Sequence, residues 1–255
     1  MKPGKIEQYI GQRAEEDGGM LFFLIDPEDQ EPEKAGKLAK EAEAAGADLV
    51  LVGGSIGAQG LILDKTCSEI KAASKLPVVL FPGNTATLTP EADALYFMSM
   101  MNSRNPYWIF SAQMTAAPVV KRMGIEPIPT CYMVVEPGGA VGWVADAKLL
   151  PRKKPYIAAA AALAAEYMGS RLIVTDSGSG APDPAPKEFV AAVASALTVP
   201  YIYGGGIRKP EQAGEIIAAG ASGVQIGTAF EGKKSVREQM EPFVKAVKKA
   251  GKAKL

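Results

Sequence analysis

The chain has 255 residues, 47% of them apolar, with 28 acidic and 28 basic side chains and no histidine. This length suits one domain spanning residues 1–255, and the balanced charge gives no basic surface for nucleic acid, so we expect no nucleic-acid binding. The absence of histidine leaves carboxylates, hydroxyls or a metal ion on oxygen ligands to carry any catalysis.

Short apolar runs of strand length recur along the chain. They lie at 21–25, 49–52, 78–81, 95–98, 130–135, 171–175, 200–203 and 223–226. Helical patterns such as 33–45, 106–123, 158–168 and 211–219 separate them. Eight such units in a chain of this length predict an α/β fold, the (β/α)8 TIM barrel.

Three connections depart from a regular barrel. Segment 82–93 is short and rich in breakers, PGNTATLTP among them, which favours a loop in place of the third helix. Segments 137–155 and 176–187 are long connections after the fifth and sixth strands. Long loops in a barrel commonly face the active site, so we expect both segments there.

Glycine follows the last two predicted strands, in YIYGGGIRKPE (201–211) and GVQIGTAF (223–230). Without a Cβ in the way, backbone N–H groups can close on an anion at these exits. TIM barrels build a phosphate site from the loops after strands 7 and 8, so the pattern predicts a phosphorylated substrate. The alternative is that these glycines only turn the chain.

Carboxylates end two of the predicted strands. Asp26 ends the first strand before Pro27, and Ser55 ends the second, so the two could share Mg²⁺, which needs few protein oxygens when a substrate supplies phosphates. Asp26 as a helix N-cap is the alternative. Asp176 follows the sixth strand and is the candidate base, and no lysine at the strand ends offers a Schiff base.

Four segments together, LIDPED, NSRNPYWI, VVEPGGAVGWVADAKLLP and GGGIR with IGTAFE, resemble the geranylgeranylglyceryl phosphate synthase family over most of the chain. The resemblance implies a Mg²⁺-dependent prenyltransferase on a TIM barrel. Such an enzyme joins geranylgeranyl diphosphate to the C3 hydroxyl of sn-glycerol 1-phosphate, the first ether bond of archaeal membrane lipids.

The resemblance also implies roles for individual residues. Asp26 and Ser55 would hold Mg²⁺ on the diphosphate, and Asp176 would take the proton of the C3 hydroxyl. The glycerol phosphate would be bound by Val174, Thr175, Asp176, Ser177, Gly178, Ser179, Gly180, Gly205, Gly206, Gly227 and Thr228. The family usually reads YLEAGSGA where this chain reads VTDSGSGA, so Val174 stands for a tyrosine and Asp176 for a glutamate.

The prenyl tail needs an apolar groove, and LYFMSMM (95–101) with PYWIF (106–110) supplies aromatic and methionine surface for one, unless these side chains are ordinary core. Cys67 and Cys131 are too few for a disulfide framework, and no run approaches the ~20 apolar residues of a membrane span. We therefore expect a cytoplasmic protein with buried thiols. The resemblance adds a homo-oligomer and transient contact with a membrane surface.

Two other functions fit the phosphate pattern. A sugar-phosphate isomerase or lyase would use the same glycine exits, with a base at another strand end and no Mg²⁺. A barrel that binds phosphate without catalysis is the other alternative.

Overall fold

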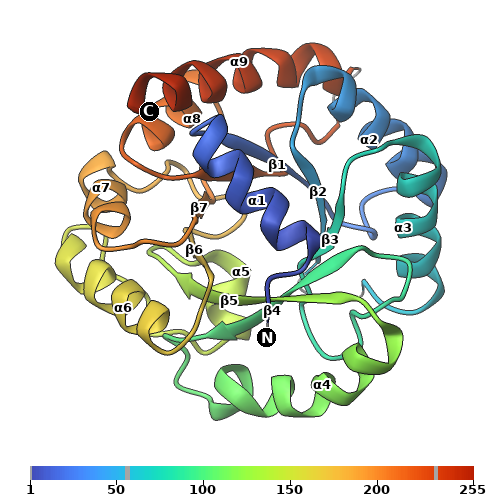
Figure 1. The fold of residues 1–255 in the computed structure, drawn as a ribbon, viewed down its shortest axis with the longest axis horizontal. Helices are drawn as coiled ribbons and strands as arrows, with labels where there is room; N and C mark the ends of the chain where they lie inside the picture. The colour runs from blue at the N-terminus through green and yellow to red at the C-terminus, as the bar shows by residue number, and fades with distance from the viewer. Residues whose placement is uncertain (1, 55–57, 233–234) are drawn as a thin grey trace.

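The computed structural model describes residues 2–54, 58–232 and 235–255, and its strands close into one parallel barrel in chain order (Figure 1). The strands are β1 (Met20–Ile25), β2 (Leu49–Val52), β3 (Val78–Leu80), β4 (Ala94–Met100), β5 (Glu126–Val134), β6 (Leu172–Asp176), β7 (Tyr201–Gly204) and β8 (Gly223–Ile226). β8 pairs with β1, with Met20 opposite Gly223, and this pairing closes the ring. The predicted TIM barrel is confirmed.

Helices surround the barrel wall (Figure 1). They are α2 (Pro32–Ala45), α3 (Leu61–Ala73), α4 (Ala112–Met123), α6 (Pro155–Tyr167), α7 (Lys187–Ser195), α8 (Pro210–Ala218) and α9 (Val236–Lys254). A π-helix, η1 (Tyr107–Ser111), leads directly into α4, so the expected helix 106–123 begins with a wider turn. No helix in the described ranges is long and apolar enough to cross a bilayer.

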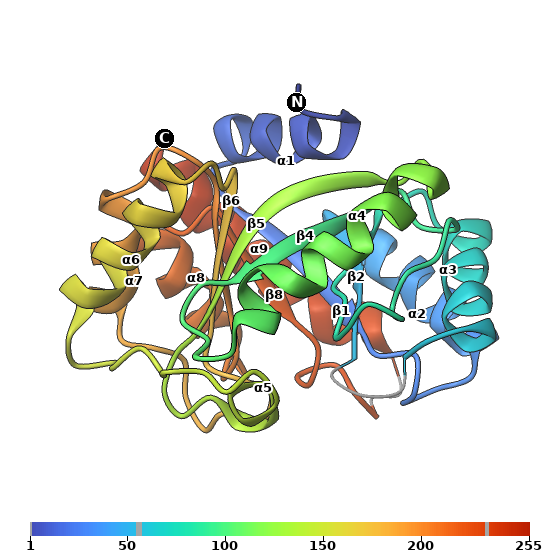
Figure 2. The same ribbon diagram turned by 90° about the horizontal axis from the view of Figure 1, so that it is seen from below.

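The two ends of the barrel carry different helices. Figure 2 shows α1 (Lys5–Glu16) across one end and the short α5 (Gly139–Val144) at the other. The carboxylate of Glu126, at the start of β5, accepts hydrogen bonds from the backbone N–H groups of Ile6 (2.9 Å) and Glu7 (2.8 Å) in the first turn of α1. Thus α1 covers the amino end of the strands and leaves the carboxyl end to the loops.

Segment 81–93, between β3 and β4, contains no helix, which confirms the expected loop at this position. The connection after β5 differs from expectation, because α5 forms inside what the sequence indicates only as a long loop. Its glycines and small residues carry little helical signal of their own, and the helix is only a turn and a half in length.

Side chains of each strand alternate between the barrel interior and the layer under the helices. On β6, Leu172 and Val174 pack inside and Ile173 packs outside. On β8, Val224 and Ile226 pack outside. The period of two therefore directs Asp176 and Gln225 into the barrel. Both cysteines are buried, and burial raises the pKa of each thiol to about 12, so neither is a nucleophile at neutral pH.

Lys248 of α9 ties the helix layer to β2 through a buried carboxylate. Its Nζ lies 2.6 Å from Asp48 Oδ1 and 3.1 Å from Asp17 Oδ2, and Asp48 is 3% exposed. Lys248→Met would leave Asp48 buried without its cation, and we expect the free energy of unfolding in urea to fall by about 3 kcal/mol. Lys245→Met, at an exposed position of the same helix, is the matched control. An equal loss in both variants would contradict the prediction.

Candidate functional site

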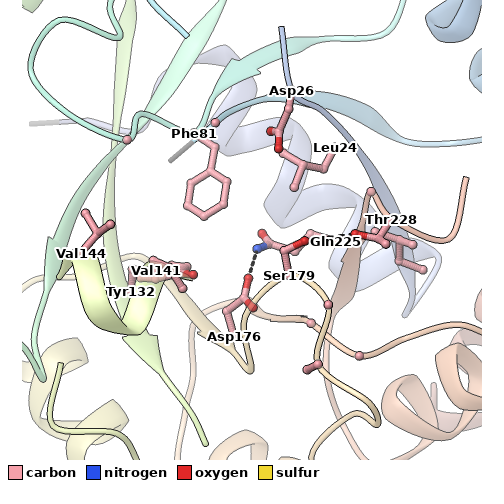
Figure 3. A pocket seen from close by; sticks show the side chains of 18 of the residues that line it. Leu24, Asp26, Phe81, Tyr132, Val141, Val144, Asp176, Ser179, Gln225 and Thr228 are labelled. Carbon is pink, nitrogen blue, oxygen red and sulfur yellow. Dashed lines mark hydrogen bonds between the residues drawn. The ribbon is translucent and has the colours of Figure 1, made fainter. Parts of the chain in front are cut away.

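A cavity of about 1150 Å³, including its open mouth, lies at the carboxyl end of the barrel (Figure 3). Its walls come from strand ends and the loops that follow them, as expected for a TIM-barrel site. The walls include Leu24, Asp26, Phe81, Met98, Trp108, Tyr132, Val141, Asp176, Arg208, Gln225 and Glu231. An apolar side and a polar side thus face the same space.

Most of the residues that the sequence predicts for the site lie on this cavity. They are Asp26, Asp176, Ser179, Gly180, Gly205, Gly206, Gly227 and Thr228. Ser55 lies outside the described residues. The chain therefore brings the candidate base, the candidate metal ligand Asp26 and both glycine exits together.

The remaining predicted residues do not line the cavity. Val174 packs in the barrel interior, and Thr175 and Ser177 hydrogen bond through their hydroxyls to Tyr201 (2.6 Å) and Tyr203 (2.8 Å). The backbone N–H of Gly178 donates to Asp176 Oδ1 at 2.6 Å. These four residues support the segment from behind, and their binding roles stay predictions.

The glycines after β7 have a steric reason beyond turning the chain. Gly205 and Gly206 have φ of 84° and 75°, and a Cβ on Gly206 would lie 2.4 Å from the carbonyl carbon of Asp183. A Cβ on Gly205 would lie 2.7 Å from Asp176 Oδ1. Only glycine lets the backbone after β7 pass this close to the loop after β6. The loops after β6, β7 and β8 therefore form one compact wall.

Hydroxyls and one cation border this wall. Ser179 Oγ and Thr228 Oγ1 lie 3.1 Å apart and join the loop after β6 to the loop after β8 (Figure 3). The guanidinium of Arg208 lines the cavity and donates long hydrogen bonds of 3.3 Å to the carbonyls of Gly180 and Ala181. A positive charge, two hydroxyls and glycine backbone are the groups that suit a phosphate monoester.

Asp176 is buried, and donors surround its carboxylate. Gly178 N donates to Oδ1, Gln225 Nε2 donates to Oδ2 at 2.9 Å, and the Tyr132 hydroxyl is near enough to stabilise the charged carboxylate. Burial raises the pKa of Asp176 above its ordinary value, and these three donors oppose that rise. The group is therefore a stronger base than an exposed aspartate, and it is held in one orientation.

Tyr132 supplies a phenol near Asp176, although the chain lacks the tyrosine of the family pattern. Val174, where the family usually has tyrosine, lies directly beside Tyr132 across the β5–β6 pairing. Tyr132 approaches the carboxylate from the neighbouring strand, so a tyrosine hydroxyl still lies near Asp176. Burial and the Asp176 charge both raise the pKa of Tyr132, which keeps it a donor.

Asp26 faces the same cavity with an uncompensated charge. Its Oδ1 is buried without a hydrogen-bond partner, and burial together with Asp29, Glu231 and Glu28 raises its pKa to about 6. No group of three or more metal-ligating side chains occurs in the described part of the chain. A site with few carboxylates fits Mg²⁺, which binds one or two protein carboxylates and completes its shell with phosphate oxygens and water.

A second cavity of about 450 Å³ adjoins the first and is almost wholly apolar. Pro82, Met98, Met100 and Trp108 line both cavities. Leu88, Leu95, Phe97, Ala112 and Ala116 line only the second, which runs under the loop that replaces the third helix. Met98, Met100 and Trp108 of the predicted tail surface face this space, whereas Met101 and Phe110 line neither cavity.

Gln225 and Tyr132 are site residues that were not predicted from the sequence. A signal for Gln225 was present, because an amide in the middle of the fully buried strand β8 requires hydrogen-bond partners in the barrel interior. Tyr132 gives no such signal, since a tyrosine in an apolar strand is ordinary core.

Comparisons with known proteins agree with this geometry. Residues 13–251 match the model of the PcrB family. The chain is 51% identical over 238 residues to the geranylgeranylglyceryl phosphate synthase of Pyrococcus horikoshii, covering 93% of each chain. It is 49% identical over 251 residues to that of Thermococcus kodakarensis, covering 97% of this chain and 99% of the relative.

A solved structure is also similar. The crystal structure of (S)-3-O-geranylgeranylglyceryl phosphate synthase from Thermoplasma acidophilum, in complex with its substrate sn-glycerol-1-phosphate, matches with a TM-score of 0.93 and 37% identity, covering 98% of this chain and 100% of that one. Matches of this length and identity show common descent across the whole barrel, and the chain belongs to the PcrB family.

Proposed function

We propose that the protein transfers a geranylgeranyl group from geranylgeranyl diphosphate to the C3 hydroxyl of sn-glycerol 1-phosphate, forming the first ether bond of archaeal membrane lipids. The observation that carries this proposal is a buried carboxylate, Asp176, between a phosphate-type wall and an apolar cavity. The relatives' names and the glycerol phosphate in the Thermoplasma crystal structure support the choice of substrates.

The acceptor is oriented by its two ends. The phosphate would lie against Gly205, Gly206, Gly227 and Thr228, where backbone N–H groups and Arg208 neutralise it. The C3 hydroxyl would then reach Asp176, because this carboxylate borders the same wall. Holding both ends fixes the nucleophilic oxygen before the donor reacts.

The transfer breaks one carbon–oxygen bond and forms another. The bond between C1 of the prenyl group and the diphosphate oxygen breaks, and the diphosphate leaves with the electron pair. The C3 oxygen of glycerol phosphate forms the ether bond to C1, and Asp176 takes the hydroxyl proton. An allylic centre ionises readily, so a carboxylate is a sufficient base.

Mg²⁺ is the cofactor that we propose, held by Asp26 and Ser55. When bound, it neutralises the charge that develops on the departing diphosphate. The unpartnered Oδ1 of Asp26 supports this assignment. Localisation in the cytoplasm, a homo-oligomeric state and transient membrane contact stay predictions, and light scattering and vesicle flotation test the last two.

The proposal is tested by forming product from radiolabelled sn-glycerol 1-phosphate and geranylgeranyl diphosphate, with and without Mg²⁺. We expect Mg²⁺-dependent ether product. Absence of product at every prenyl length would refute the proposal and favour a sugar-phosphate enzyme or a phosphate-binding barrel.

Distant barrels with TM-scores from 0.55 to 0.63 share no more than 16% identity with the chain and bear on the fold alone.

The apolar second cavity is the proposed site of the prenyl tail. Ala116 of α4 lines this cavity but not the first, so Ala116→Phe would fill space that only a long tail reaches. We expect kcat/KM for geranylgeranyl diphosphate to fall on the order of tenfold or more, with a smaller change for the ten-carbon geranyl diphosphate. The adjacent Ala117→Phe, at an exposed position, is the control. Equal losses with both donors would place the tail elsewhere.

A further inference from the structure

The two amide atoms of the Gln225 side chain differ sharply in their surroundings. Its Nε2 donates to Asp176 Oδ2 at 2.9 Å, whereas its Oε1 is buried without a hydrogen-bond partner. The side chain is 3% exposed and lines the cavity. A buried amide oxygen without a partner costs about 1–3 kcal/mol, so this acceptor is suited to a ligand donor.

The orientation of the amide follows from its neighbour. Turning the amide over would bring Oε1 against the carboxylate of Asp176, and two acceptors would then repel each other. The NH₂ group therefore faces Asp176 and the carbonyl oxygen faces away from it. Figure 3 shows this amide joined to Asp176 inside the cavity.

The pairing of β6, β7 and β8 positions Asp176 and Gln225 next to each other. Asp176 lies opposite Gly204 in the β6–β7 pairing, and Gly204 lies opposite Gln225 in the β7–β8 pairing. A Cβ on Gly204 would lie 2.6 Å from Asp176 Oδ2 and 2.8 Å from Gln225 Nε2, so glycine at this position makes room for the contact. Gln225 is also two residues before Gly227, which lies in the proposed phosphate wall.

Glycerol phosphate has one polar group between its two ends. With the phosphate against Gly227 and the C3 hydroxyl at Asp176, the C2 hydroxyl would lie between them, next to Gln225. The hydroxyls of Ser179 and Thr228 already bond to each other, whereas the Gln225 carbonyl lacks a donor. We propose that Gln225 Oε1 accepts a hydrogen bond from the C2 hydroxyl while its Nε2 orients Asp176.

This contact has a consequence for substrate choice. The two enantiomers of glycerol phosphate place the C2 hydroxyl on opposite sides when the phosphate and the C3 hydroxyl are fixed. Only one enantiomer brings the hydroxyl to Oε1, and the other leaves the amide oxygen unpaired. Gln225 is therefore a specificity residue for a secondary alcohol of one configuration, and this role rests on the proposed function only for the identity of the acceptor.

The test pairs a side-chain change with a substrate change. Gln225→Met keeps the volume and removes the amide, and 3-hydroxypropyl phosphate lacks only the C2 hydroxyl. For the unaltered protein we expect kcat/KM, and the affinity measured by calorimetry without prenyl donor, to fall at least about tenfold when this hydroxyl is absent. In Gln225→Met, kcat/KM and the affinity should each differ by less than about threefold between the two ligands.

Two further variants separate this role from a structural one. Gln225→Glu retains an acceptor, so it should still prefer the ligand with the C2 hydroxyl, while the added charge shifts the acid limb of the pH–rate profile upward. Thr130→Val alters a buried interior hydroxyl that does not line the cavity and should keep the full discrimination. Unaltered protein that binds glycerol phosphate without turning it over would refute the proposed function alone. Equal discrimination by Gln225→Met and the unaltered protein would overturn the inference about Gln225.

Discussion

Asp176→Asn is expected to lower kcat by about 10²–10⁴-fold with little change in the affinity for glycerol phosphate. The asparagine keeps the shape of the side chain and can still accept a hydrogen bond, but it cannot take the proton of the C3 hydroxyl. Measuring kcat and KM separately tests the expectation. Because burial raises the pKa of Asp176, activity of the unaltered protein should rise with pH through that pKa as the carboxylate forms.

Asp176→Glu is the matched variant, since it restores the residue that the family usually has at this position. A longer carboxylate keeps the base but must share the space with Tyr132 and Gln225, so we expect activity between those of the unaltered protein and of Asp176→Asn. An Asp176→Asn variant with unaltered turnover would remove the catalytic role from this residue.

Asp26→Asn is expected to have opposite effects on activity and stability. Loss of the carboxylate should lower kcat/KM for the prenyl diphosphate by on the order of a hundredfold or more, because the Mg²⁺ that we propose at this site would lose its charged ligand. The same change should stabilise the metal-free fold, since burial and neighbouring carboxylates hold the pKa of Asp26 at about 6 instead of 3.8. This pKa difference corresponds to a gain of at most about 3 kcal/mol in the free energy of unfolding above pH 6.

The pH dependence of this stabilisation has a definite sign. The unfolded chain loses the Asp26 proton near pH 3.8 and the folded chain near pH 6, so stability falls as pH rises between those values. Urea unfolding of the two metal-free proteins should therefore agree at pH 3.5 and diverge by pH 7. Glu33→Gln, at an exposed position on α2, is the control. A variant less stable than the unaltered protein at pH 7 would refute the account of Asp26.

The barrel and much of its site could be predicted from the sequence because both depend on local patterns. Strand-length apolar runs predict the barrel. The positions around the cavity are predicted by glycine, Asp26 and Asp176 at the strand ends. A buried amide in β8 indicates that Gln225 needs a partner, but the sequence does not identify Asp176 as that partner, because Tyr132 and Gln225 approach Asp176 from β5 and β8 only when the barrel closes. Val174 cannot donate a hydrogen bond as a tyrosine would, and the structure places Tyr132 beside it on the neighbouring strand.

The loop that replaces the third helix changes the kind of molecule that this barrel can hold. A helix in that place would cover β3 and β4, and its side chains would fill the space that Pro82 and Leu88 now border. Without it, the ligand space extends from the polar mouth along the barrel wall and ends among apolar side chains. The two cavities together thus have a polar end and an apolar end, which is the division of an amphiphile such as a single-chain lipid.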